Sequence, residues 1–266
     1  MNHSLLALCQ DINIPREIAD EVATIDITPM AQYIDSLLSS EKAKITYEHV
    51  ASLGDDPRGV KMLALQLTAA LHSRAIYVQK GISDHIFIDT MKCFTRFVCE
   101  HLIQFDHYGF DRGWWTWQQL SLNLFRLGTL EFEMKIKENK NILSVHIPSD
   151  AVMTKADLDT SYQWANNFFA EYFPDFKYEG VYCDTWLLAP VLKEMLKPGS
   201  KILNFMADYS ILSTNPDAKD FMMWVYMKEY PDIDSLPENT SLQRDIKKHL
   251  QTGGKVGTAL GQYIAN

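Results

Sequence analysis

The spacing of apolar residues changes at Gly128, and this change constrains the fold more than any other feature of the chain. In residues 59–80 and 83–105, apolar side chains recur every three to four positions, as they do on one face of an α-helix. In residues 129–136 they recur at every second position, as they do on one face of a β-strand. The sequence therefore predicts a helical first half and a second half that contains a sheet.

Weaker patterns extend this prediction to the whole chain. Further helices are expected in the first half at residues 16–24, 31–40, 44–53 and 114–127. In the second half, strands are expected at residues 129–136, 143–147, 180–188 and 222–227, and helices at residues 157–173, 190–197 and 240–253. Thr240 begins the last helix with a capping-box sequence. The predicted fold class is α+β, with an all-helical domain at residues 1–127 and a mixed α/β domain at residues 128–266.

Composition restricts the classes of function. The 266 residues include 25 Lys and Arg against 34 Asp and Glu, and this net charge of −9 is unsuited to a general nucleic-acid binder. No apolar run approaches the ~18–20 residues of a membrane span, and residues 1–9 lack the basic flank of a signal peptide. We therefore expect a cytoplasmic protein with no nucleic-acid or membrane partner. The cysteines form no CxxC pair and are expected to be reduced.

A histidine and a carboxylate on the predicted hairpin are the first candidates for chemistry. If the apolar residues of both strands face the same side, Ile136 pairs with Leu143 and Glu133 lies opposite His146. A register shifted by two residues places Glu131 opposite His146 instead. In both registers a carboxylate adjoins an imidazole, which makes a usable general base near neutral pH. The same pattern is also typical of an exposed cross-strand ion pair.

Residues 241–266 form a basic segment in an acidic chain. They contain four lysines or arginines and one aspartate, so their net charge is +3. Cations beside flexible glycine backbone suit a phosphate or pyrophosphate group. The candidates for cofactor contacts are Arg244, Lys247, Lys255, Gly253 and Gly254. The alternative is a helix C-terminus whose basic residues complement the helix dipole.

Aromatic and histidine-rich segments provide further candidates. Trp114, Trp115 and Trp117 cannot all face one side of a helix, so at least one lies at a domain boundary or in a pocket. The histidines of residues 85–111 match no zinc motif, and no metal is expected. The candidate substrate contacts are Asp184, Trp186, Trp117 and Arg126.

Six segments are distinctive when they are taken together. They are DTMKCFTRF (89–97), DRGWWTWQQL (111–120), LFRLGTLEFE (124–133), VHIP (145–148), CDTWLL (183–188) and LPENTSLQR (236–244). As a set they resemble a bacterial family of acyltransferase-domain proteins. Members of that family have a helical N-acyltransferase N-terminal domain followed by a GNAT-like C-terminal domain.

The resemblance implies transfer of an acyl group from acyl-coenzyme A to an amine-type small-molecule acceptor, with acyl-coenzyme A as co-substrate. In a GNAT-type mechanism a base takes the amine proton while the enzyme positions both substrates. His146 is then the general base, Glu133 or Glu131 orients it, and Asp184 contacts the substrate. The usual Gln/Arg-x-x-Gly-x-Gly/Ala turn for the pyrophosphate is absent. A non-catalytic small-ligand-binding protein and a hydrolase that uses the His–carboxylate pair on water are the alternative functions.

Overall fold

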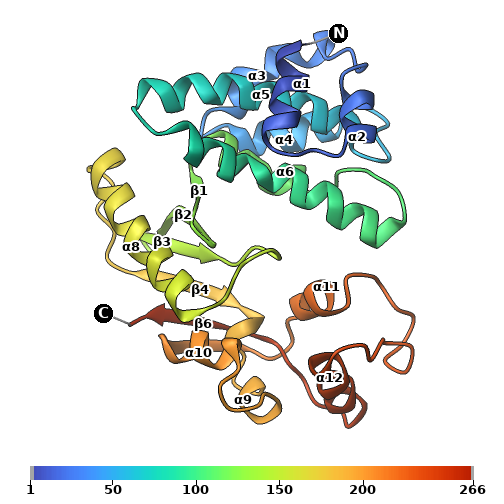
Figure 1. Cartoon of the computed structure of the whole chain (residues 1–266), viewed down its shortest axis with the longest axis vertical. Helices are drawn as coiled ribbons and strands as arrows, with labels where there is room; N and C mark the ends of the chain where they lie inside the picture. The colour runs from blue at the N-terminus through green and yellow to red at the C-terminus, as the bar shows by residue number, and fades with distance from the viewer. Residues whose placement is uncertain (1–2, 265–266) are drawn as a thin grey trace. The chain divides into compact units, whose positions relative to one another are not determined.

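The computed structural model describes residues 3–264 and divides into two compact units (Figure 1). The first unit extends to Leu127 and also includes Phe168–Phe173, and the second contains Gly128–Asn167 and the residues from Pro174 on. Among the described residues, no helix combines the length and the apolar character that a membrane crossing requires.

The first unit is built from helices around one central helix. Its elements are α1 (His3–Asp11), α2 (Arg16–Val22), the 3₁₀ helix η1 (Thr28–Tyr33), α3 (Ile34–Leu37), α4 (Ala43–Ala51), α5 (Val60–Gln79), α6 (Asp84–Phe105), α7 (Gly113–Leu120) and strand β1 (Leu124–Leu127). Helix α5 packs against α1, α2, α3, α6 and α7. Its Leu63, Leu65 and Leu67 are fully buried although they lie on different sides of the helix. Burial on all sides is typical of a core helix.

Polar side chains of α5 hold both ends of α7. Gln66 Nε2 donates to the Gly113 carbonyl at 3.0 Å, and Ser73 Oγ donates to the Leu120 carbonyl at 3.0 Å. Each of these side chains is buried, so the bonds satisfy groups that would otherwise be costly to remove from water. The position of α7 is therefore determined by specific bonds as well as by apolar packing.

The helices predicted for the first half are present, but the last one is shorter than expected. The prediction of a helix through residue 127 is wrong, because α7 ends at Leu120 and the chain continues as β1. Leu122 has a left-handed φ of 55°, and the Asn123 N–H donates to the Gln118 carbonyl at 2.9 Å. A residue in this conformation ends a helix. Helix α1 lies outside the predicted helices.

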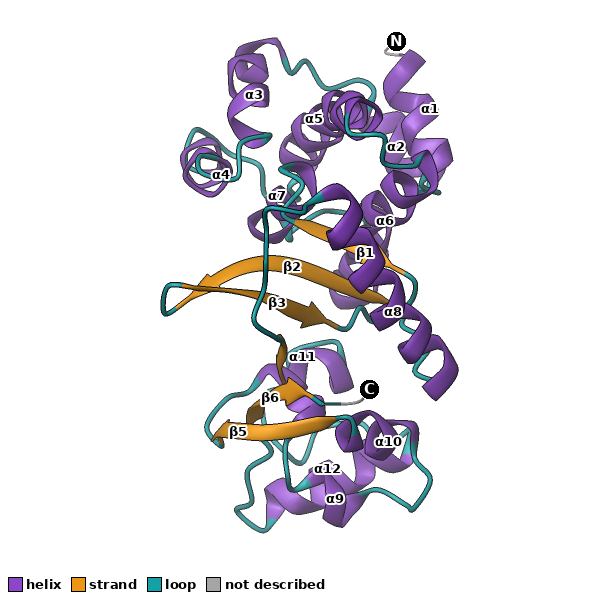
Figure 2. Cartoon of the chain, turned by 90° about the vertical axis from the view of Figure 1, so that its left-hand side faces the viewer, coloured by secondary structure: helices purple, strands orange, loops and turns teal. Residues whose placement is uncertain are grey.

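The second unit is a mixed sheet with helices, and the last turn of its first helix, from Phe168 on, belongs to the first unit. Its elements are β2 (Leu130–Lys137), β3 (Lys140–His146), α8 (Lys155–Tyr172), β4 (Val181–Thr185), the 3₁₀ helix η2 (Trp186–Leu188), α9 (Leu192–Met195), α10 (Lys201–Ala207), β5 (Tyr209–Asn215), α11 (Asp220–Tyr226), α12 (Ser241–Gln251) and β6 (Thr258–Tyr263). The strands lie in the order β2-β3-β4-β6-β5, and Figure 2 shows them in orange. Strands β3 and β4 are parallel, with α8 as their crossover, and the other neighbouring pairs are antiparallel. The predicted α+β class is confirmed.

Helix α8 packs on one face of this sheet through aromatic side chains. The ring of Tyr162 stacks on Tyr263 with centroids 3.8 Å apart and meets Phe132 at 5.8 Å. The Tyr162 hydroxyl also forms a hydrogen bond with the Tyr209 hydroxyl. Phe132 pairs with Val145 of β3, so Val145 shares this face, and the residues that flank Phe132 and Val145 along their strands project from the opposite face.

The pairing of β2 with β3 follows the second of the two predicted registers. Glu131 lies opposite His146, as the shifted register predicts. The register that pairs Ile136 with Leu143 is wrong. Apolar alternation requires only that apolar residues share a face, and both registers satisfy that requirement.

The turn between the strands decides the register. Lys137 pairs with Lys140, so only Glu138 and Asn139 connect the strands, with φ values of 52° and 63°. Two successive residues with positive φ are typical of the type I′ turn that closes two-residue hairpins. Ile136, predicted to face the core, lies beside this turn and is 72% exposed.

The segment of residues 222–227 was expected to be a strand, and this prediction is wrong, because most of it lies in helix α11. A short apolar run is compatible with either structure. Asp220 in the first turn favours a helix start, and Phe221 and Tyr226 are buried from that helix. Elsewhere the Thr240 capping box opens α12 as predicted. Helix α10 and strand β5 lie outside the predicted elements.

Candidate functional site

The face of the sheet opposite α8 carries titratable side chains from three neighbouring strands. We call them the polar row: Glu131 and Glu133 of β2, His146 of β3, and Asp184 of β4. Glu131 lies opposite His146, and Ser144 lies beside Tyr182. Because side chains two residues apart share a face, His146 and Asp184 project from the same face as Ser144 and Tyr182. The structure thus brings the four candidate catalytic residues to one side of the sheet.

The imidazole of His146 contacts Glu133 and not the glutamate directly opposite. Its Nε2 is 2.8 Å from Glu133 Oε2. Glu133 lies opposite the small Ser144, and a diagonal neighbour in an antiparallel pair is within reach of a long side chain. The side chain of Glu133 is 11% exposed and that of His146 is 25% exposed. Lys135 Nζ lies 3.9 Å from the same Glu133 oxygen.

This contact determines which imidazole nitrogen is basic. A neutral ring that donates its Nε2–H to an ionised carboxylate carries its lone pair on Nδ1. When Nδ1 takes a proton, the charge of Glu133 stabilises the imidazolium that forms. His146 with Glu133 therefore has the arrangement of an oriented general base.

His146 and Asp184 lie near the carboxyl ends of the two parallel strands. The register that joins β3 to β4 pairs Leu143 with Val181 and Ser144 with Tyr182, and both strands then continue, to His146 and to Thr185. In open α/β sheets, ligands bind outside the carboxyl ends of parallel strands. Asp184 is exposed. This edge of the sheet is the candidate reaction site.

The segment between His146 and helix α8 is hydrogen-bonded to Thr129, which precedes the first strand of the hairpin. The Val152 N–H donates to Thr129 Oγ1 at 2.6 Å, and the Thr129 N–H donates to Ser161 Oγ at 2.8 Å. Gly128 precedes with a φ of 71°, and a Cβ there would lie 2.6 Å from Ser161 Oγ. Glycine at this position allows the hairpin to approach α8 closely.

The ammonium group of Lys247, in the basic segment, is hydrogen-bonded to other residues of the same chain. Its Nζ donates to the Asp234 carbonyl at 2.8 Å, to the Leu236 carbonyl at 2.9 Å and to Glu238 Oε1 at 2.8 Å. An ammonium group has three N–H donors, so these three bonds use all of them. We assign Lys247 the role of holding residues 234–238 against α12.

The other basic candidates do not lie together. Arg244 is exposed in the first turns of α12 and donates to the Glu238 carbonyl at 2.7 Å. Lys255 follows the end of α12, and its Nζ lies 2.6 Å from Asp217 Oδ1. At a rise of about 1.5 Å per residue, Arg244 lies roughly 10 Å from the end of α12, after which Lys255 follows. Gly253 and Gly254 end α12, and their N–H groups donate to carbonyls of its last turn.

The remaining candidates have different environments. Trp186 is buried at the start of η2. Trp117 of α7 and Arg126 of β1 are half-buried within the first unit. Cys183 is a free thiol, and burial raises its pKa well above the usual range, so it is not a thiolate nucleophile at neutral pH. Within residues 3–264, no cluster of three or more His, Cys, Asp or Glu side chains could hold a metal ion.

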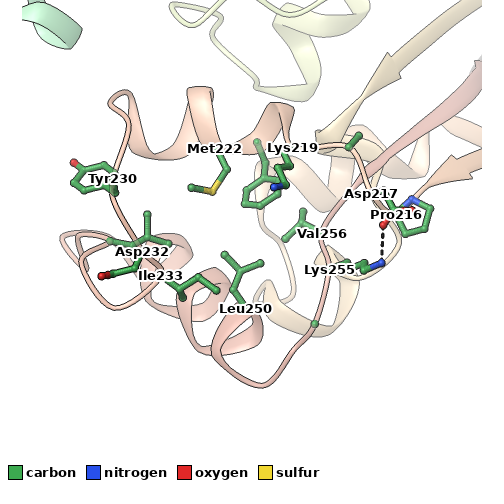
Figure 3. A pocket seen from close by; sticks show the side chains of 14 residues that line it. Pro216, Asp217, Lys219, Met222, Tyr230, Asp232, Ile233, Leu250, Lys255 and Val256 are labelled. Carbon is green, nitrogen blue, oxygen red and sulfur yellow. Dashed lines mark hydrogen bonds and ion pairs between the residues drawn. The ribbon is translucent and has the colours of Figure 1, made fainter.

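A cavity of about 320 Å³ lies among α11, α12 and the segments that flank them (Figure 3). Its apolar lining consists of Phe221, Met222, Ile233, Leu236, Leu250 and Val256. Sequence reasoning missed this cavity because it interpreted residues 222–227 as a strand. The signal that could have found it is the helical spacing of Phe221, Met222, Val225 and Tyr226.

The fold of the two units is shared with acyltransferases of known structure. One is the crystal structure of an acyltransferase in complex with decanoyl-CoA and teicoplanin, with a TM-score of 0.81 and 22% sequence identity. Another is an acyltransferase in complex with CoA and 10C-teicoplanin, with a TM-score of 0.81 and 21% identity. Both matches cover 97% of this chain and 86% of the other.

Family models account for nearly the whole chain. Residues 3–122 match the N-acyltransferase N-terminal domain, and residues 124–263 match the GNAT-like C-terminal domain. The chain therefore belongs to the family that joins these two domains, as its six segments predict. A comparison with curated proteins finds no match.

Proposed function

We propose that this protein transfers an acyl group from acyl-coenzyme A to the amine of a small-molecule acceptor. The observation that carries the proposal is the His146–Glu133 contact of 2.8 Å near the carboxyl end of β3. Membership of the family supports it. Further support comes from acyltransferases of the same fold that bind decanoyl-CoA and teicoplanin.

In this reaction the amine nitrogen attacks the thioester carbonyl carbon. His146 Nδ1 takes the amine proton, and Glu133 stabilises the resulting imidazolium. The amide bond forms as the carbon–sulfur bond breaks, and the coenzyme A thiolate leaves and is protonated. Asp184 and Glu131 add negative charge near the site, which favours the approach of a cationic acceptor. Trp186 supports the end of β4 from the core, and Trp117 and Arg126 stay predicted substrate contacts.

The basic segment contributes two exposed cations to this proposal, each for a separate anionic group of coenzyme A. Lys255 is 61% exposed at its side chain and adjoins the flexible Gly253–Gly254 backbone. Arg244 lies too far along α12 to meet the same phosphate and meets a separate anionic group. Lys247 is excluded from phosphate binding because its donors are already used.

The cavity favours a second function, in which the protein binds a small apolar ligand without catalysis. A volume of about 320 Å³ lies at the lower end of the range of about 300–1,000 Å³ for small-molecule sites. The two functions differ in whether a thioester bond is broken.

Release of the coenzyme A thiol distinguishes these functions. The purified protein is incubated with acetyl-, octanoyl- or decanoyl-CoA, with and without teicoplanin and a panel of simple amines. Thiol release that requires an amine, with amide product detected by mass spectrometry, supports the transferase. Equal release without an amine indicates a hydrolase. Thermal stabilisation without thiol release indicates a binding protein, and the absence of stabilisation at millimolar acyl-CoA contradicts the proposal.

A further inference from the structure

We infer that the cavity among α11 and α12 receives the distal part of an aliphatic acyl chain of medium or greater length. This inference rests on the proposed function, because it takes the acyl group of acyl-coenzyme A as the occupant. It assigns acyl-chain selection to residues 216–256, a segment between β5 and β6 that is separate from the polar row.

The chemistry of the lining suits an uncharged chain. Six of the fourteen lining residues have large aliphatic, thioether or phenyl side chains, and two of them, Leu236 and Val256, are 2% and 5% exposed. Figure 3 shows Met222, Ile233 and Leu250 directed into the cavity. Burying a charged group against such walls costs free energy that an aliphatic chain does not incur.

Four charged residues, Asp217, Lys219, Asp232 and Lys255, also contribute to the lining. Lys255 and Asp217 form an ion pair with each other at 2.6 Å, which Figure 3 shows at one margin of the cavity. Asp232 Oδ1 accepts a bond from the Ser235 N–H at 2.8 Å. Because these carboxylates already have partners in the chain, they compete weakly for a ligand. An acyl chain needs no polar partner at its end.

The cavity volume sets an approximate chain length. Small groups of the size of water or methylene occupy about 30 Å³ each, so 320 Å³ holds roughly ten of them. The cavity therefore accommodates up to about ten carbons at the distal end of an acyl chain, in addition to the carbons that reach it from the reaction site. An acetyl group would leave it almost empty.

Strand directions place the cavity at the same edge of the sheet as His146 and Asp184. Strands β4 and β5 are both antiparallel to β6, so β5 runs parallel to β4 and to β3. The carboxyl end of β5 is Asn215, and the cavity lining begins at the next residue. Figure 1 shows β3 pointing toward the side of the sheet where α11 and α12 lie.

The separation between the reaction site and the cavity matches an acyl chain. Thr185 at the end of β4 pairs with Ala259 near the start of β6, and Val256 of the lining lies three residues before Ala259. One to two strand spacings of about 4.8 Å therefore separate a carbonyl between the ends of β3 and β4 from the start of β6. An extended chain advances about 1.2 Å per bond, so roughly four to eight bonds bridge this distance. The carbons beyond them enter the cavity.

Lys247 keeps the cavity open without a ligand. Its bonds to the Asp234 and Leu236 carbonyls hold the segment that contributes Ile233 and Leu236 to the lining. A site that is formed before binding spends less free energy on ordering its walls. This role differs from phosphate contact and accounts for the buried position of Lys247.

Met222 permits a paired test because it is half-buried and its side chain lines the cavity. Met222→Trp narrows the cavity and Met222→Ala enlarges it. Met223→Trp is the matched control, because Met223 is the next residue of α11, is 40% exposed and does not contribute to the lining. Isothermal titration calorimetry gives the Kd of acetyl-, octanoyl-, decanoyl- and dodecanoyl-CoA for each protein, and no acceptor is needed.

The wild type is expected to bind decanoyl-CoA at least about tenfold more tightly than acetyl-CoA, because each buried methylene strengthens binding up to roughly fourfold. Met222→Trp should reduce this preference and leave the Kd of acetyl-CoA within about twofold of wild type. Met222→Ala enlarges a cavity that these chains do not fill, so it should leave the preference for decanoyl-CoA in place. Met223→Trp should change neither ratio. Thermal unfolding of each variant establishes that it is folded.

Other outcomes overturn the inference. Equal affinity of the wild type for acetyl- and decanoyl-CoA overturns the chain site and leaves the proposed function intact. The chain site is also overturned, and the proposed function left intact, if Met222→Trp weakens the binding of acetyl- and decanoyl-CoA by the same factor or changes neither Kd. In a parallel titration with teicoplanin, a Met222→Trp variant that loses affinity for teicoplanin alone would show that the cavity holds the acceptor, which also overturns the inference. Failure of the wild type to bind any acyl-CoA contradicts both the cavity assignment and the proposed function.

Discussion

The polar row and the basic segment of the second unit both contain a cationic or basic side chain that meets a glutamate, but the two are used differently. Lys247 is buried, and its three N–H groups bond to Asp234, Leu236 and Glu238 of its own chain. His146 meets Glu133 near the end of β3 through one imidazole nitrogen, and the side chain of His146 is 25% exposed. The comparison shows that burial separates the two: Lys247 is enclosed by the acceptors of its own chain, whereas His146 is partly exposed near the carboxyl end of a strand.

Removal of the imidazole should have the largest effect. His146→Ala is expected to lower the rate of acyl transfer by about 10²–10⁴-fold, because the base that takes the amine proton is lost. The KM for acyl-CoA should be unchanged, since His146 acts on the acceptor. Glu133→Gln keeps the shape of the partner and should lower the rate less. Lys137→Ala, at the exposed turn of the same hairpin, is the control in steady-state kinetics, and a His146→Ala variant with the wild-type rate would remove the assignment.

Loss of the Lys247 ammonium should act on stability and leave the chemistry intact. Lys247→Met keeps the length of the side chain but removes three donors from buried or half-buried acceptors, and the free energy of unfolding should fall by about 2 kcal/mol. Lys248→Met, at the neighbouring exposed position, should change it by less than about 0.5 kcal/mol. Urea unfolding measures both. If Lys247→Met instead kept full stability and lost affinity for free coenzyme A, Lys247 would be a phosphate contact.

Lys255 should have a smaller effect, on binding alone. Lys255→Ala is expected to raise the Kd of coenzyme A by about three- to tenfold at low salt, because one charge-assisted contact is lost. Its ion pair with Asp217 is exposed, so the free energy of unfolding should change by less than about 1 kcal/mol. Calorimetric titration at two salt concentrations tests this expectation, and Arg244→Ala tests the second cation separately. A Kd that does not change at low salt rules Lys255 out.

The ion pair between Arg74 and Asp84 in the first unit is expected to contribute the least to the free energy of unfolding. Arg74 donates to Asp84 at 2.7 and 2.6 Å, and this hydrogen bonding lowers the pKa of the Asp84 carboxyl. Because the folded-state pKa lies below the unfolded one, the stabilisation is full above the unfolded value and is lost as pH falls through the folded value, below about pH 4.

Asp84→Asn should therefore lower the free energy of unfolding by about 0.5 kcal/mol at pH 7, since both side chains are partly exposed. The difference from wild type should shrink as the pH is lowered toward 3. Urea unfolding at both pH values measures it. A difference that grows on acidification would show that Asp84 does not act through its ionised form.

Several features of the fold follow from local sequence. The change of apolar period at Gly128 predicts the change from helices to a sheet, and the Thr240 capping box predicts the start of α12. The family is also apparent in the sequence, because its six segments are short and continuous. The hairpin register is harder to predict from the sequence, because apolar alternation permits both registers. The two-residue turn, in which Glu138 and Asn139 have positive φ, determines which register forms.

The candidate site shows the same division. Glu133 and His146 are recognisable from residue type and alternation, because side chains two positions apart on a strand share a face. The basic segment is recognisable from charge, but the occupied donors of Lys247 are not, since Asp234 and Leu236 lie more than ten residues away. The cavity among α11 and α12 combines residues from separate segments and has no local pattern.

By itself, the sequence determined the fold class, the family and the residue types available for chemistry, because these depend on local periodicity and short motifs. Only the tertiary structure decided that His146 contacts Glu133 and not Glu131, that Lys247 is a structural cation, and that an apolar cavity lies at the edge of the sheet that carries His146. The physical reason is that turn geometry, side-chain reach and the packing of distant segments set these contacts, and none of them is expressed in the neighbours along the chain.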